Sequence, residues 1–144
     1  MPTIIPENQI QNLQQIEAAV AGPEGANRLI IITGHLLLFI NAATQAAGGQ
    51  QQRNEAFSVL IGPVLTKQQF FRAIGTASLS RTFVNLNSVG SSGWGISGID
   101  ADRDDESGQV ELRFDLFVTV SGQNNTVTIN EVDFHVTILA AVAT

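Results

Sequence analysis

Residues 109 to 120 alternate between polar and apolar side chains, with Phe117 as the exception among the polar positions. The apolar positions are Val110, Leu112, Phe114, Leu116, Val118 and Val120. Successive side chains of a β-strand point to opposite faces, whereas an α-helix repeats about every 3.6 residues. The pattern therefore predicts a half-buried antiparallel strand, and with it a mainly β fold.

The next segment predicts a second strand in which the apolar positions change parity. These positions are Val127, Ile129, Val132, Phe134, Val136 and Ile138. One extra residue would keep all of them on the same face, so we predict a β-bulge near Asn130. A similar change across Gly98 predicts a bulge in the preceding strand. Together these strands predict a three-stranded meander, at 93–101, 109–120 and 126–139, within 93–139.

The first segment, residues 6–22, has a different spacing. Ile10, Leu13, Ile16 and Val20 are three or four residues apart, and Pro6 suits a first helical position. We therefore expect an amphipathic N-terminal helix, packed on the body of the molecule or laid as an arm on a neighbouring subunit. With a β-rich body over 28–144, the fold class we predict is an antiparallel β-sandwich or flattened barrel with this one helix.

Size and composition limit the class of protein. A chain of 144 residues fits one domain, 1–144. There is no cysteine for a disulfide, a thiolate metal site or a nucleophile. The net charge is −6 and Lys67 is the only lysine, so we expect no nucleic-acid partner. No apolar run is long enough for a membrane-spanning helix, and the N-terminus does not resemble a secretory signal, so we expect a soluble chain. Its compartment stays open, since cytoplasmic synthesis fits both a resident protein and a subunit of a virion or exported particle.

Five of the thirteen carboxylates crowd into 100–108, in the predicted loop of the first hairpin. Their spacing can be matched to the oxygen ligands of a calcium loop by Asp100, Asp102, Asp104, Glu106 and Glu111. Asp105 stands where a calcium loop needs glycine, and the flanks resemble strands, so an EF-hand is not expected. Two interpretations remain, a looser calcium site and a solvated hairpin tip that Arg103 partly neutralises.

Other residues that could carry chemistry form no recognised signature. In the predicted meander, Asp115 would face Asp133, with His135 close by, and this trio could act as an acid and a base only in a sheltered pocket. His35 lies in the most apolar segment and is interpreted as a core residue. Trp94 is either a core anchor or an exposed contact residue. We therefore expect no enzyme.

Absence of a catalytic signature and a neutral, polar surface favour a structural protein that works through subunit interfaces. The leading expectation is a subunit of a homo-oligomeric virion, tail-like or filamentous assembly, with Trp94, Ile10, Leu13, Ile16 and Val20 as interface candidates. An alternative is a module that binds a glycan or a protein through loop 100–108, assisted by calcium.

Overall fold

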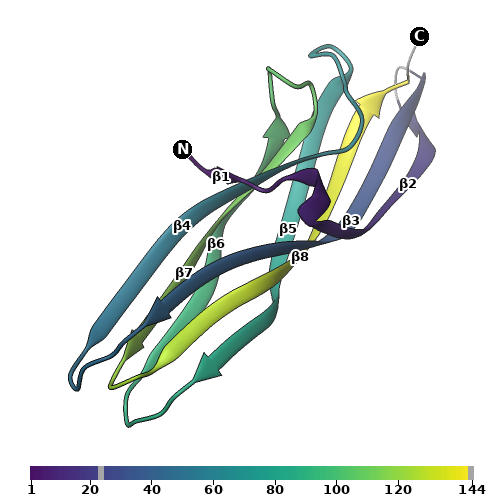
Figure 1. Ribbon diagram of the computed structural model, residues 1–144. Coiled ribbons are helices and arrows are strands. Elements are labelled where there is room, and N and C mark those ends of the chain that lie inside the picture. Colours follow the sequence, from purple (N-terminus) through teal and green to yellow (C-terminus); the bar gives the residue numbers. More distant parts are fainter. Residues whose placement is uncertain (23–24, 143–144) are drawn as a thin grey trace.

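The computed structural model describes residues 1–22 and 25–142 and shows a β-sandwich of two facing four-stranded sheets (Figure 1). Mainly β structure and a sandwich architecture are thus confirmed. The elements are β1 (Thr3–Ile4), the 3-10 helix η1 (Glu7–Gln9), β2 (Ile10–Gly22), β3 (Gly25–Ala43), β4 (Gln50–Ile61), β5 (Phe70–Asn85), β6 (Ser92–Arg103), β7 (Val110–Ser121) and β8 (Thr126–Ala141).

The strands divide between two sheets in a way that sequence neighbours do not follow. Sheet A has the order β1-β4-β7-β6, and sheet B has the order β2-β3-β8-β5. All pairings are antiparallel except that of the two-residue β1 with β4, which is parallel. The chain changes sheet after β1, β3, β4, β5 and β7, so the hairpins β2–β3 and β6–β7 are the connections that stay within one sheet.

The core lies between the sheets and is formed by the alternating residues that the sequence pattern identified. All six predicted inward residues of β7 are buried, and so are all six of β8. Phe114 of β7 stacks on Phe57 of β4, with ring centroids 5.9 Å apart. The register of β8 with both neighbours is irregular between Ile129 and Glu131, and that of β6 with β7 is irregular between Ser97 and Asp100. Both predicted bulges are therefore confirmed.

The predicted N-terminal helix is wrong. Among the described residues the only helix is η1, and the segment expected to be helical forms β2. A bulge between Gln11 and Gln14, where Asn12 adopts φ +52°, shifts the register of β2 on β3. The side chain of Gln14 points to the outer face of sheet B, so that of the preceding Leu13 points toward the core. Ile16 lies opposite Ile31, whose side chain is on the outer face, and therefore also points outward. Helix-like spacing thus arose from apolar residues on both faces of a bulged strand.

The predicted three-stranded meander is half right. β6 and β7 form the expected hairpin, but β8 pairs with β3 and β5 in the other sheet. Both β7 and β8 bury one face, and two strands in facing sheets can share one core as well as two adjacent strands can. The alternation of side chains gives the buried face of each strand and does not identify its neighbours.

The two sides of the sandwich differ. On one side the edge strands β5 and β6 approach closely, and a Cβ atom at Gly75 of β5 would lie 3.1 Å from that of Ala101 of β6. On the other side β2 is matched in sheet A only by the short β1. The N-terminal segment crosses from β1 beside β4 to β2 beside β3 (Figure 1). The sandwich is therefore closed along β5 and β6 and open along β2.

Candidate functional site

The acidic segment covers the end of β6 and the tight hairpin connection to β7: Asp100 and Asp102 lie in β6, and Asp104, Asp105 and Glu106 lie in the connection. The carboxylate of Asp104 accepts hydrogen bonds from the backbone N–H (2.9 Å) and the hydroxyl (2.7 Å) of Ser107. These bonds hold the pKa of Asp104 below its usual value, with the Ser107 hydroxyl contributing most. Gly108, at φ +77°, donates its N–H to the Asp104 carbonyl and closes the turn. One of the five clustered acids is therefore a turn residue.

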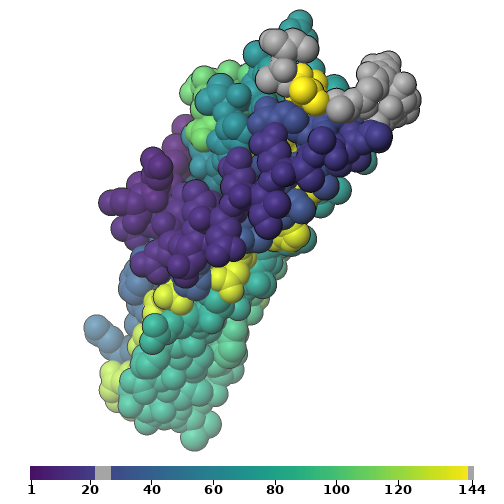
Figure 2. Space-filling model, turned by 90° about the vertical axis from the view of Figure 1, so that its right-hand side faces the viewer, coloured from purple at the N-terminus to yellow at the C-terminus, as the bar shows by residue number. Residues whose placement is uncertain are grey.

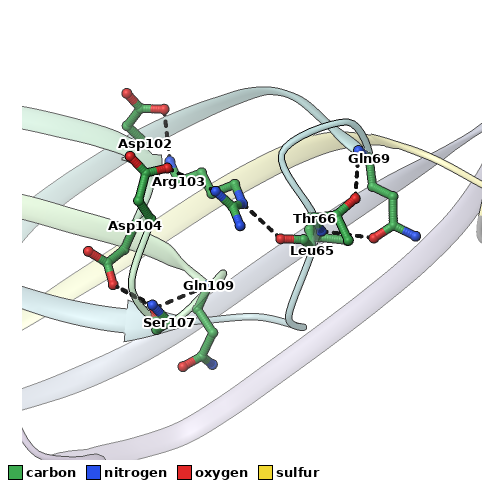
Figure 3. A network of polar contacts seen from close by, with 9 residues as sticks. Leu65, Thr66, Gln69, Asp102, Arg103, Asp104, Ser107 and Gln109 are labelled. Carbon is green, nitrogen blue, oxygen red and sulfur yellow. Dashed lines mark hydrogen bonds and ion pairs between the residues drawn. The ribbon is translucent and has the colours of Figure 1, made fainter.

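Arg103 ties this hairpin to the connection between β4 and β5 (Figure 3). Its Nε donates to the Leu65 carbonyl at 2.7 Å, and its guanidinium pairs with Asp105 at 2.9 Å. The Leu65 N–H in turn donates to the Gly108 carbonyl at 2.9 Å. The expectation that Arg103 partly neutralises the acidic tip is confirmed.

The remaining carboxylates spread along the outer surface of β6 and β7. Asp100 lies opposite Arg113, and Asp102 lies opposite Glu111. These side chains and Glu106 line an open depression of about 410 Å³. No three acidic or histidine side chains in the described residues are placed to hold a metal ion. Nothing in this geometry favours the calcium interpretation, which stays a prediction.

The trio Asp115, Asp133 and His135 is not brought together. Asp115 lies on the outer face of sheet A, opposite Ala56 and Ser97. Asp133 and His135 lie on the outer face of sheet B, on the other side of the core. The expected pairing of Asp115 with Asp133 is therefore wrong, because β7 and β8 belong to different sheets.

His35 forms a charge cluster that the sequence interpretation missed. It lies on the outer face of sheet B, where its Nδ1 contacts the Asp133 carboxylate and its Nε2 lies 3.0 Å from the Glu131 carboxylate. The hydrogen bond to Asp133 is the main cause that raises the pKa of His35, with a further contribution from Glu131. Interpretation as a core residue was wrong. Strict alternation with the buried Ile32 and Leu36 would have placed position 35 outward.

The interface candidates from the sequence all lie on edge strands of the two sheets. Trp94 lies on the edge strand β6, with 42% of its surface exposed. Ile10 is partly buried against the core, whereas Leu13, Ile16 and Val20 are exposed on β2. Ile10 and Leu13 also line a groove of about 410 Å³ between β2 and the end of β4. β2 takes the place of the helix that was expected to carry Ile10, Leu13, Ile16 and Val20, and the interface role of all five residues stays a prediction.

Among the described residues, no helix has the length and apolar character needed to cross a bilayer. Comparison with protein-family models, curated proteins and solved structures gives no match for this chain.

Proposed function

We propose that this protein is a structural subunit of a homo-oligomeric assembly, such as a virion, a tail-like particle or a filament, and that it acts through contacts between subunits. The observation that carries the proposal is a contiguous apolar area on the outer face of sheet B. We call it the sheet B patch and define it as Ile16, Leu29, Ile31, Ile74 and Leu139.

The sheet B patch crosses all four strands of the sheet. One cross-strand row runs from Ile16 through Ile31 and Thr137 to Ile74, and the next row runs from Ala18 through Leu29 and Leu139 to Arg72. Ile16 is 66% exposed and Ile74 is 60% exposed. Single exposed apolar side chains are ordinary, whereas a contiguous apolar area on an outer sheet face is typical of a contact surface.

The composition of the whole chain is suited to repeated contacts between copies. With one lysine and many Gln, Asn, Ser and Thr side chains, the molecule carries few charges that would lose their water on association. The acidic hairpin lies at the β6 edge of sheet A and leaves the sheet B patch free of its charge. Both features support association with further copies of the chain.

The test is the mass of the protein in solution over a wide concentration range, by light scattering or sedimentation. We expect species larger than the 15.3 kDa monomer. Ile74→Lys, which places a charge in the sheet B patch, should weaken association at least tenfold. Ser78→Lys is the matched control, because it adds the same charge on the same strand outside the patch. A wild-type protein that stays monomeric at high concentration contradicts the proposal.

A further inference from the structure

Strand β2 is exposed on both faces. Every residue from Gln11 to Ala21 is exposed, although the strand has 13 residues and pairs with β3 on both sides of its bulge. In Figure 2 the purple atoms of the N-terminal residues, which include β2, lie on the face turned to the viewer. Because β2 buries little surface against the core, its pairing with β3 holds it in place.

The outer edge of β2 has the properties of a pairing surface. In the described residues no strand lies beside it, so a row of backbone N–H and C=O groups faces outward. Edge strands usually block such pairing with lysine, proline, bulges or a covering segment. The bulge of β2 lies at its start, near Asn12, and its only charged residue, Glu17, forms an ion pair with Arg28 of β3. From Gln14 to Ala21, Glu17 is the only charged residue, and no proline, no bulge and no described segment covers the edge.

We infer that β2 pairs antiparallel with β2 of a second copy of this chain, around a two-fold axis at Ala18. The two B sheets then join into one continuous eight-stranded sheet. This inference rests on the proposed assembly function and assigns one of its interfaces. Pairing would satisfy the free backbone groups of both edges, and the same surface of each copy serves as donor and acceptor.

The side chains favour this register over those centred on Glu17 and on Ile16. With Ala18 opposite Ala18, Ile16 meets Val20 of the second copy on the outer face, and each gains an aliphatic cross-strand partner. Glu17 then meets Ala19. Centring the pair on Glu17 instead would place two carboxylates opposite each other. Centring it on Ile16 would bring the irregular residue Asn12 opposite Val20 and interrupt the hydrogen-bonded ladder.

Charge also permits this contact, although the chain has a net charge of −6. The ion pair of Glu17 with Arg28 leaves the paired strip nearly neutral. The acidic hairpin follows β6, the edge strand that lies against β5, and β5 is the opposite edge of sheet B from β2. The main negative charge is thus on the side of the sandwich away from the paired edge.

Since the chain has no cysteine, single cysteines report the contact directly. In Ala18→Cys the two new thiols face each other at the axis, where opposite Cβ atoms lie about 4.5–5.5 Å apart, close enough for a disulfide after a small adjustment. In Ala21→Cys they would be about 20 Å apart, given about 3.4 Å per residue. Both variants replace exposed alanines of β2, so Ala21→Cys is the matched control.

Under mild oxidation we expect at least five times more covalent dimer from Ala18→Cys than from Ala21→Cys. Gln15 lies opposite Ala21 in this register, so a mixture of Gln15→Cys and Ala21→Cys should form the covalent heterodimer. If the wild type is oligomeric and Ala18→Cys gives no more dimer than Ala21→Cys, another register or another partner occupies this edge. The inference then fails while the proposed function stands. A monomeric wild type contradicts both.

Discussion

Asn125 is a buried amide that joins three connections at one end of the sandwich. Its side-chain oxygen accepts hydrogen bonds from the backbone N–H groups of Asn87 (2.7 Å) and Ser88 (3.0 Å). Its side-chain nitrogen donates to the carbonyls of Ser121 (2.8 Å) and Ser88 (3.3 Å). Its backbone carbonyl accepts from the N–H of Thr44. One side chain thereby satisfies backbone groups of the β5–β6 and β7–β8 connections.

We predict that Asn125→Ala lowers the free energy of unfolding by about 2 kcal/mol or more, because each buried backbone group left without a partner costs about 1–3 kcal/mol. Urea denaturation measures this change. Asn54→Ala is the control, since Asn54 is exposed on β4 and surface substitutions usually stay within about 0.5 kcal/mol. Equal stabilities of the two variants would show that the Asn125 amide is not needed to join these connections.

Among the strands, the bulges of β6 and β8 were predicted from a change of parity, whereas the bulge of β2 was missed because its segment was predicted to be a helix. Around Gly98 and Asn130, long alternating runs on both sides made a single extra residue the simplest explanation. In β2 the bulge near Asn12 lies directly after η1. Before the bulge only Ile10, which lies opposite the buried Leu36, points toward the core. Too few alternating positions precede the bulge to reveal period two, so helical spacing fitted equally well.

The acidic hairpin gives a prediction about cation binding. Its carboxylates do not converge on a common point, so we expect calcium to leave the thermal unfolding midpoint unchanged relative to chelator. A bound ion at 100 times its dissociation constant would instead add about 2.7 kcal/mol. Asp102→Asn serves as the comparison, because it removes one of the spread carboxylates. A calcium-dependent rise of the midpoint that Asp102→Asn abolishes would establish the calcium interpretation.

At the scale of the whole molecule, the His35 cluster joins β3 and β8, the two central strands of sheet B. The raised pKa of His35 means that the folded state binds its proton more tightly than the unfolded state does. The resulting stability is fully present below the ordinary pKa of 6.5 and is lost as the pH rises through the raised value. Unfolding free energy should therefore decrease from about pH 6 upward as His35 titrates.

Chemical denaturation at a series of pH values measures this dependence. His35→Gln should remove most of the decrease, because glutamine cannot carry the charge that Asp133 and Glu131 stabilise. His135→Gln is the matched control, since it replaces the other histidine and leaves the His35 contacts in place. The same decrease in wild type and His35→Gln would exclude the His35 cluster as its source.

Sequence patterns alone identify the chain as mainly β, the buried faces of β7 and β8, the positions of two bulges and the hairpin connection that follows β6. These features depend on side-chain alternation within a strand and on turn residues, which are local. Three features became evident only from the pairing of distant strands: β8 joins the other sheet, His35 contacts Asp133 and Glu131, and β2 is an uncovered edge. Each of these depends on which distant strands share a sheet, because a strand with one apolar face can bury it equally well beside, or opposite, many partners.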